Sequence, residues 1–416
     1  MKKNTWAKIQ IISVFRNHLF ILISLLGILA ITSILTAQSN SIPFHISANL
    51  FDSSQPGTLG LKPAPETETF TIFHPSDTTD KYSNGVVLIS FKGHLYAQWQ
   101  SSSKDEDASD TWVAYSRSPD GIHWSEPMVL APRQEKGIYT SGGWWTFGDT
   151  LVAYINVWSE WNNKSKGGFT QYRTSTDGIH WSQFKSLLNR DELPVAGIFE
   201  QDPHALPHGR IISAVHEQPG LIVYPYFTDD PRGITGWTRG VMDHLPFEGF
   251  VSRELEPSWF YTSDGSIVML FRDQASSFRK LAAISRDRGE TWSTPVVTEM
   301  PDSRAKQSAG NLPDGTAYQV NCPSGSKTRF PLVIILSQDG KLFDKAYLLR
   351  SGGADLQPKR FEGKYKRIGY SYPKSVIWKD YLYIAYATNK EDVELTRVPL
   401  HSLRYSNESH GEPVEP

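Results

Sequence analysis

Four short segments of the chain repeat one pattern at a regular interval. Each has a Ser, an Asp two residues later, a Gly shortly after that and an aromatic residue at its end. The segments are residues 118–124, 175–181, 285–292 and 337–343, and the last copy is the weakest. Their Asp residues lie about 55 residues apart with one interval of about twice that length, and residues 230–237 form a degenerate copy in the vacant slot. A repeat of this length corresponds to one four-stranded sheet, and such sheets close into a ring.

The repeated segments are similar to the Asp-box, a hairpin turn. In such a turn the Asp side chain accepts hydrogen bonds from turn amides, Gly adopts a positive φ and the aromatic side chain fills the gap beneath. We therefore expect an all-β protein, a six- or seven-bladed β-propeller, with these turns on its outer hairpins. His123 and His180 occupy the same position in two copies, so we expect them to belong to the turns as well.

Short β-rich runs between these turns predict where the innermost strand of each blade begins. The expected starting points are Asn84, Thr140, Glu200, Glu256, Gln307 and Tyr370. This gives six blades, and a shorter seventh blade in the irregular stretches remains an alternative. The segment 68–73 is expected to pair with the last blade and close the ring. The propeller would then occupy residues 67–405, followed by a tail over residues 406–416.

The N-terminal region has the pattern of an export signal. Basic residues precede an apolar run over residues 19–37, and a small residue, Ala37, precedes a polar stretch. We expect residues 1–37 to be a signal peptide or, if they are not cleaved, a membrane anchor. The protein would then be periplasmic or secreted. Residues 38–66 are rich in Pro and are expected to form a loose leader.

The composition narrows the range of partners. Lys and Arg number 42 against 44 Asp and Glu, so bulk charge gives no reason to expect nucleic acid as a partner. The 13 Trp residues favour a protein that stacks aromatic rings on sugars. A single Cys322 excludes an internal disulfide and a Cys-based zinc site. No compact cluster of His and carboxylate ligands is visible, so we expect no metal and no cofactor in the chemistry, and we expect a monomer.

Ligands of propellers usually bind where the innermost strands converge, so polar and aromatic residues on those strands are the candidates. The expected substrate-binding residues are Trp144, Trp145, Gln274, Lys306, Gln307, Asn321 and Arg367. Carboxylates are few there, the main ones being Glu200, Asp202 and Glu256. Because a glycosidase normally needs two opposed carboxylates, this set suits another reaction better.

The reaction that fits is β-elimination next to a uronate. A cation and amides neutralise the carboxylate, a His or Tyr removes the C5 proton, and a second such group protonates the leaving oxygen. The expected catalytic residues are Arg272 for neutralisation, His204 or His216 as base, and Tyr224 or Tyr370 as acid. The expected partner is therefore an acidic oligosaccharide.

Several stretches resemble a particular group of propeller enzymes. These are residues 82–93, 96–102, 105–107, 139–145, 368–374 and 386–392. They look like the seven-bladed enzymes of rhamnose–uronate linkages, which include ulvan lyases, an ulvan oligosaccharide dehydratase and an α-L-rhamnosidase branch. The resemblance implies a lyase or dehydratase that forms an unsaturated uronate. The alternatives are a glycoside hydrolase, either a rhamnosidase or a sialidase, and a non-catalytic sugar-binding propeller. A sialidase is suggested by the Asp-boxes, although an Arg-Ile-Pro type motif is missing from the sequence.

Overall fold

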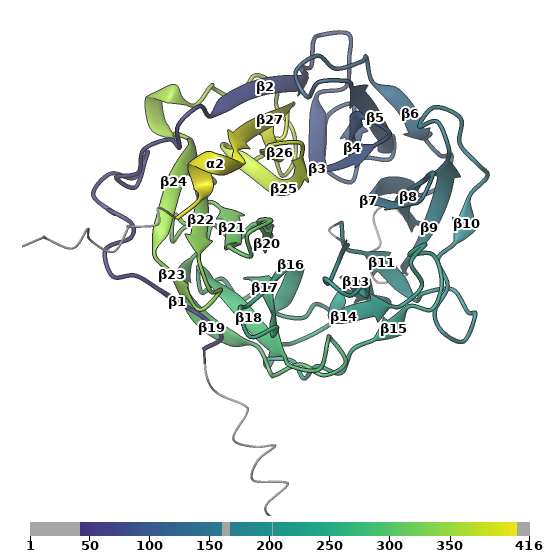
Figure 1. Cartoon of the computed structure of the whole chain (residues 1–416). Helices are drawn as coiled ribbons and strands as arrows, with labels where there is room; N and C mark the ends of the chain where they lie inside the picture. The colour runs from purple at the N-terminus through teal and green to yellow at the C-terminus, as the bar shows by residue number, and fades with distance from the viewer. Residues whose placement is uncertain (1–41, 160–166, 202, 406–416) are drawn as a thin grey trace, which may run out of the picture. The chain divides into compact units, whose positions relative to one another are not determined.

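Six antiparallel sheets form a ring in the computed structural model, which describes residues 42–159, 167–201 and 203–405 (Figure 1). Each sheet is one blade, and its strands follow one another from the centre of the ring to the outside. The all-β propeller is therefore confirmed with six blades. The seventh blade that the resemblance implied is not found among the described residues.

The first three blades follow the chain in order. The first blade contains β3 (Tyr82–Phe91), β4 (His94–Ser102), β5 (Trp112–Ser118) and β6 (Met128–Ala131). The second contains β7 (Ile138–Phe147), β8 (Thr150–Trp158), β9 (Gly168–Ser175) and β10 (Lys185–Ser186). The third contains β11 (Gly197–Phe199), β13 (Ile211–Glu217), β14 (Ile222–Thr228) and β15 (Thr238–Arg239), and β12 (His204–Ala205) also pairs with β13.

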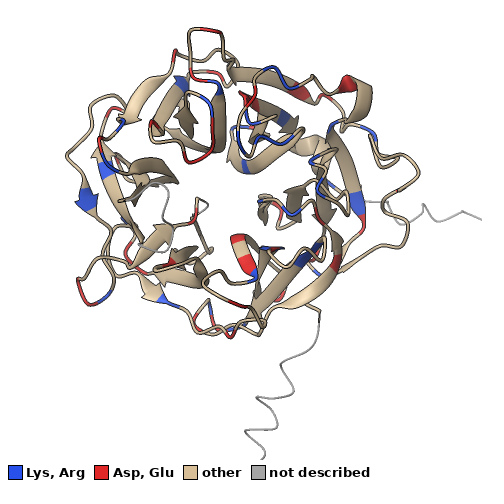
Figure 2. Cartoon of the chain, turned by 180° about the vertical axis from the view of Figure 1, so that it is seen from behind, with Lys and Arg blue, Asp and Glu red and all other residues tan. Residues whose placement is uncertain are grey.

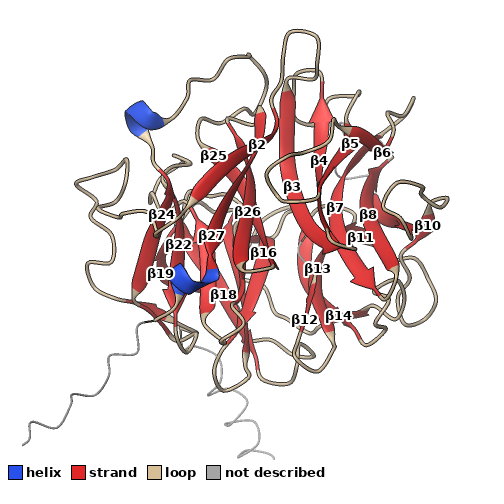
Figure 3. Ribbon diagram, turned by 45° about the horizontal axis from the view of Figure 1, so that its top comes forward, coloured by secondary structure: helices blue, strands red, loops and turns tan. Residues whose placement is uncertain are grey.

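The remaining blades complete the ring. The fourth contains β16 (Glu254–Tyr261), β17 (Ile267–Asp273), β18 (Arg279–Ser285) and β19 (Val296–Pro301). The fifth contains β20 (Ser308–Asn311), β21 (Ala317–Asn321), β22 (Leu332–Ser337) and β24 (Lys345–Arg350). The sixth contains β25 (Tyr370–Trp378), β26 (Tyr381–Thr388), β27 (Asp392–Pro399) and β2 (Glu68–Phe73). Short helical turns lie at η1 (Gly353–Asp355) and α2 (Leu400–Leu403), and strands account for most of the ordered structure (Figure 3).

The hydrophobic core lies between neighbouring blades. Strand β22 shows this directly, because its side chains alternate between two clusters. Leu332, Ile334 and Leu336 pack towards the sixth blade, whereas Val333 and Ile335 pack towards the fourth. Both faces of such a strand are buried, which explains its continuous apolar sequence.

The Asp-box turns connect the third and fourth strands of their blades, as the sequence predicted. In the first blade, Asp120 Oδ1 accepts hydrogen bonds from the amides of Ile122 and His123 at 2.9 and 2.8 Å. The His123 ring stays at the turn, with Nδ1 2.7 Å from Asp120 Oδ2. In the next blade, Trp181 fills the space beneath the turn and donates a hydrogen bond to Tyr115 Oη. The Asp and His thus stabilise the turn itself, and Trp181 joins the hairpin of the second blade to the first.

Strand β2 closes the ring by pairing with β27 in the sixth blade, which confirms the expected role of segment 68–73. The register places Glu68 opposite Arg397, and the two side chains form an ion pair. The last blade therefore contains strands from both ends of the propeller sequence.

The leader differs from the expectation of a loose segment. From Ile42 onwards it packs on the propeller, and β1 (His45–Ile46) pairs in parallel with β23 (Leu342–Phe343). Phe44 is 1% exposed, with its ring 6.2 Å from that of Phe260 and 5.3 Å from that of Phe343. The reason is the apolar residues of this segment, which cover the outside of the fourth and fifth blades.

The predicted signal or anchor over residues 1–37 and the tail over residues 406–416 lie outside the described residues. Among the residues that the structure describes, no helix has the length and apolar character needed to cross a bilayer. The export and membrane assignments therefore stay predictions.

The packing of the leader can be tested by substitution. Phe44→Ala is expected to lower the free energy of unfolding by about 3 kcal/mol because it removes a buried ring. Phe250→Ala, at a position that is 67% exposed, is expected to change it by less than about 0.5 kcal/mol. Thermal and urea unfolding measure both values, and equal effects would contradict the observed packing.

Candidate functional site

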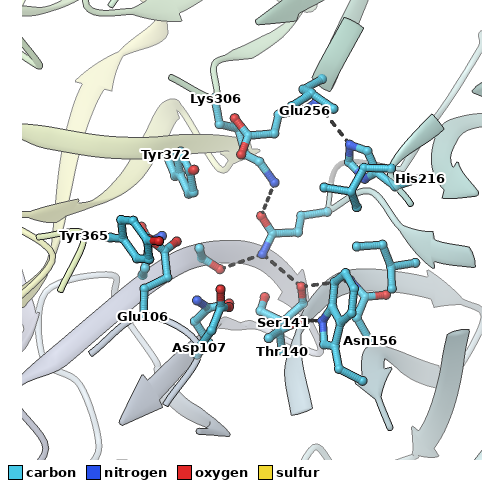
Figure 4. A pocket seen from close by; sticks show the side chains of 18 of the residues that line it. Glu106, Asp107, Thr140, Ser141, Asn156, His216, Glu256, Lys306, Tyr365 and Tyr372 are labelled. Carbon is cyan, nitrogen blue, oxygen red and sulfur yellow. Dashed lines mark hydrogen bonds between the residues drawn. The ribbon is translucent and has the colours of Figure 1, made fainter. Parts of the chain in front are cut away.

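A cavity of about 1010 Å³ lies where the inner strands converge. Its wall is formed by inner strands of the first, second, third, fourth and sixth blades, together with two loops at residues 105–109 and 364–365. Figure 4 shows Glu256, Lys306 and Tyr372 on one side of the cavity and Asp107, Thr140 and Ser141 on the other. Carboxylates, cations and a phenol thus face a common space.

The inner strands are irregular where they border this cavity. Four of them have a shift in register, and each shift includes a residue with positive φ. In the first two blades that residue is glycine, Gly85 or Gly143, whereas in the fourth and sixth blades it is Glu256 (φ 54°) and Tyr372 (φ 58°). A left-handed backbone costs a non-glycine residue roughly 1–2 kcal/mol. Strain of this kind is concentrated at functional sites, which directs attention to these two residues.

Glu256 and Tyr372 form a hydrogen-bonded unit with Arg272. The Tyr372 hydroxyl hydrogen-bonds to the Glu256 carboxylate. Arg272 Nη1 lies 2.9 Å from Glu256 Oε2 and 3.5 Å from Tyr372 Oη. Arg272 Nη2 donates to Gln274 Oε1 at 2.9 Å. The guanidinium group therefore contacts both members of the pair.

The surroundings of Glu256 and Tyr372 shift the pKa values of the two groups in opposite directions. Burial alone would raise the pKa of Glu256, but the charges of Arg272 and Lys306 and the hydrogen bonds it accepts hold that pKa well below its usual range. Burial and the Glu256 charge raise the pKa of the Tyr372 hydroxyl. The result is a protonated phenol in contact with an ionised carboxylate, which is the arrangement of a nucleophile and its base.

Two further carboxylates face the cavity with cationic partners. Lys306 Nζ lies 2.6 Å from Glu200 Oε1 and also donates to Gln201 Oε1 at 2.7 Å. Glu106 forms an ion pair with Lys390 at 2.6 Å. The next residue, Asp107, is half-buried on the loop between β4 and β5 and lines the cavity.

Cations surround the Tyr372 ring. Lys306, Arg329 and Lys390 lie 5.4, 5.2 and 5.4 Å from its centroid. Arg304 lies near Arg272. Burial and the neighbouring charge of Arg272 lower the pKa of Arg304. Within the described part of the chain, no carboxylate forms an ion pair with Arg304 or Arg329. Acidic and basic residues are mixed over the blades and loops (Figure 2).

Four of the residues predicted from the sequence do line the cavity: His216, Arg272, Gln274 and Lys306. His216 has protein partners at both ring nitrogens. Its Nε2 accepts the Glu256 amide at 3.3 Å, and its Nδ1 lies 3.9 Å from Glu200 Oε2. Burial lowers the pKa of His216, which favours the neutral ring that this contact needs.

The other three predicted catalytic residues lie outside the cavity lining. His204 stacks on Trp259 with ring centroids 3.8 Å apart. Tyr224 packs against His244, and Arg239 covers its ring. The inner strand of the sixth blade turns Tyr370 away, and its hydroxyl donates to Ser351 O at 2.6 Å.

The remaining predicted binding residues are also outside the lining. Trp144 is buried between blades, where its Nε1 donates to Val87 O. Trp145 donates to Pro231 O on the next blade. Gln307 and Asn321 are buried and bind backbone carbonyls, and Arg367 is exposed on a loop.

The catalytic and binding residues assigned from the sequence did not include Glu256 or Tyr372, although Glu256 was an expected strand start and Tyr372 lies two residues after another, Tyr370. Strict alternation along those strands does not reveal a bulge, which adds a residue and redirects the following side chain. Asp202, another carboxylate considered from the sequence, lies outside the described residues.

The fold and the cavity define a six-bladed propeller with a charged central site. Over residues 93–384 the sequence matches the family described as "BNR repeat-like domain". The chain belongs to this family, and its Asp-box turns are the repeats concerned.

Similar solved structures share the fold. A sialidase has a TM-score of 0.62 at 17% identity, with 86% of this chain and 35% of that chain covered. The Hadza microbial sialidase Hz136 has a TM-score of 0.62 at 15% identity, with 80% and 69% covered. A protein of unknown function from Dyadobacter fermentans has a TM-score of 0.60 at 15% identity, with 80% and 99% covered. The chain thus spans about a third of the first of these proteins. No curated protein matches the sequence.

The state of Glu256 gives a pH-dependent prediction. A carboxyl group whose pKa is lower in the folded state stabilises the protein above its unfolded pKa, about 4.3, and loses that contribution as the pH falls towards the folded value. At pH 7 we expect Glu256→Gln to unfold at a lower temperature than the wild type, because Arg272 loses its ionic partner. The difference should shrink between pH 4.5 and 3.

Thermal unfolding of both proteins from pH 7 to pH 3 measures this difference. Glu248→Gln, at an exposed position, serves as the control and should match the wild type throughout. A difference between Glu256→Gln and wild type that does not change with pH would show that Glu256 is not held in its ionised form.

Proposed function

We propose that the protein is a glycoside hydrolase that cleaves glycosides of an acidic sugar, with Tyr372 as nucleophile and Glu256 as its base. The observation that carries the proposal is the hydrogen-bonded unit of Tyr372, Glu256 and Arg272 at the wall of the cavity. Most glycosidases use a carboxylate as nucleophile, but sialidases use a tyrosine. A cavity of this size holds a sugar unit and part of its leaving group.

In the first step, Glu256 accepts the proton of the Tyr372 hydroxyl as the phenol oxygen attacks the anomeric carbon. The bond from that carbon to the leaving oxygen breaks, and the leaving oxygen takes a proton from an acid. The sugar is then held as an aryl glycoside, with its anomeric carbon bonded to the phenol oxygen of Tyr372. The cations around Tyr372 stabilise the negative charge that the phenol oxygen gains during attack.

In the second step, water attacks the anomeric carbon and transfers a proton to the base that served as acid before. The bond to Tyr372 breaks, and Glu256 returns its proton to the phenol oxygen. Two inversions at the anomeric carbon leave its configuration retained.

Asp107 is the residue that we assign to the acid. It lines the cavity across from Glu256 (Figure 4), so it is placed to protonate the leaving oxygen of a sugar bound between the two. Glu106 and Glu200 also line the cavity, where they form ion pairs with Lys390 and Lys306.

Two guanidinium groups at or near the cavity support an anionic sugar. Arg272 lines the cavity, and Arg304 adds a second guanidinium nearby that has no carboxylate partner among the described residues. A carboxylate on the substrate would be bound by these groups through charge-assisted hydrogen bonds. The similarity in fold to proteins described as sialidases agrees with such a sugar.

β-Elimination next to a uronate, the reaction expected from the sequence, is the second candidate because it would use the same cations. In that case Tyr372 would pass its own proton to Glu256 and its phenolate would remove the C5 proton, since both ring nitrogens of His216 face protein groups. The products distinguish the reactions, because hydrolysis adds water, whereas elimination adds none and creates an absorbing C=C bond.

The proposal is tested with 4-methylumbelliferyl glycosides of N-acetylneuraminic acid and glucuronic acid. We expect turnover of one of them, with water incorporated and the anomeric configuration retained by NMR. Tyr372→Phe should lower kcat by at least about 1000-fold. Tyr370→Phe distinguishes this assignment from the one made on the sequence and should stay within about threefold of wild type. An unsaturated product would favour the elimination candidate, and full activity of Tyr372→Phe would overturn both.

The role of Asp107 predicts a dependence on the leaving group. Asp107→Asn should lower kcat/KM by about 100-fold or more for an oligosaccharide, whose sugar alcohol needs protonation, and much less for the acidic 4-methylumbelliferone. Glu106→Gln is the adjacent control and should affect both substrates alike. Equal losses for both substrates in Asp107→Asn would exclude Asp107 as the acid.

A further inference from the structure

Both backbone polar groups of Glu256 are bound by side chains. Its N–H donates to His216 Nε2 at 3.3 Å, and its C=O accepts a hydrogen bond from Gln307 Nε2 at 2.9 Å. His216 belongs to β13 in the third blade, and Gln307 directly precedes β20 in the fifth. The bulge in β16 interrupts the strand ladder here, so groups from the two flanking blades replace the missing partners.

Gln307 is itself fixed in orientation. Its Nε2 also donates to Leu270 O at 3.0 Å, and its Oε1 accepts from Lys280 Nζ at 2.6 Å. An ammonium group can only donate, so it determines which end of the amide is oxygen and directs the NH₂ group towards Glu256. Lys280 and Gln307 are both fully buried, and neither lines the cavity.

Lys280 is held in turn by an ion pair. Its Nζ lies 2.7 Å from Asp302 Oδ1 and donates to Ala305 O at 3.1 Å. A buried ion pair is a poor source of stability compared with well-packed apolar side chains. It does, however, fix the position of the groups that it contacts, and here those groups lead to Glu256.

We infer that Gln307 and Lys280 are positioning residues for the proposed base: they hold Glu256 in its left-handed conformation, so that its carboxylate meets both Tyr372 and Arg272. This inference rests on the proposed function. It also assigns Gln307, which the sequence suggested as a substrate-binding residue, a role behind the cavity wall.

Loss of this contact has a specific consequence. If the Glu256 backbone relaxes, the carboxylate moves away from Arg272 and Tyr372, and the interactions that lower its pKa weaken. The acidic limb of the kcat/KM–pH profile, which reports the base of the free enzyme, then moves to higher pH. A variant that only folds less well would lose activity without such a shift.

The test compares Gln307→Met with Gln319→Met. Gln319 is a buried glutamine on β21 in the same blade, and its side-chain amide has no hydrogen-bond partner among the described residues. For Gln307→Met we expect kcat to fall by about 10- to 100-fold, with KM changed less than about threefold, and the acidic limb to rise. Gln319→Met should keep the wild-type limb.

Crystal structures of the two variants give a readout that needs no substrate. In Gln307→Met, we expect φ at residue 256 to leave the positive region or the Glu256–Arg272 contact to lengthen. In Gln319→Met, we expect the positive φ at residue 256 and the Glu256–Arg272 contact to be retained. If Gln307→Met does not fold, Gln307→Glu keeps the acceptor for Lys280 but lacks the donor, and the same changes are expected.

The outcomes separate this inference from the proposed function. Unchanged Glu256 geometry together with an unchanged acidic limb in the Gln307 variant would overturn the positioning role alone. Full activity of Glu256→Gln on the 4-methylumbelliferyl substrates would overturn the proposed function, whereas the crystal structures would still decide whether Gln307 fixes residue 256.

Discussion

The pairing of β2 with β27 is the interaction on which the arrangement of the site depends. It joins the beginning and the end of the propeller sequence in one blade and so closes the ring. Closure brings inner strands that are far apart in sequence to one axis. Asp107, Glu256 and Tyr372 come from the first, fourth and sixth blades, yet all three line one cavity. Since no blade contributes more than a part of the site, the geometry of the site depends on the closed ring keeping the blades in fixed positions.

Burying charged side chains at the centre of the propeller opposes folding, and pairing them with opposite charges limits this effect. Glu256 and Arg272 neutralise each other, and Glu200 and Lys306 form a second pair close by. Glu106 is matched by Lys390 in the same way. Two strained residues, Glu256 and Tyr372, stand at bulges where other blades have glycine. Sequences under selection for stability alone would favour glycine there, so the strain is consistent with a catalytic role.

The sequence predicted the architecture well because the fold is repetitive. Asp120, Asp177, Asp287 and Asp339 mark one turn in each of four blades, and their spacing gives the length of a sheet. The closing strand was predicted from its place before the first blade. Packing of the leader was not predicted, since Phe44 and the other apolar residues of this proline-rich stretch follow no periodic pattern.

The site was harder to predict than the fold. Arg272 was recognised because a charge at the end of an apolar strand needs either solvent or an anion, and it does line the cavity. Glu256 and Tyr372 gave no comparable signal, because their direction depends on bulges that sequence alternation does not reveal. The pairing of Glu256 with Tyr372 is also a long-range contact between blades, which only the closed ring produces.

The central claim is that Tyr372 attacks the sugar. A fluorinated analogue of the acidic glycoside that proves to be turned over, with a good leaving group, slows the second step and traps the glycosylated protein. Proteolysis and mass spectrometry then locate the sugar. The account predicts that the sugar is attached to the phenol oxygen of Tyr372 and that Tyr372→Phe is not labelled. Attachment to Glu256 or Asp107, with Tyr372 unmodified, would contradict it.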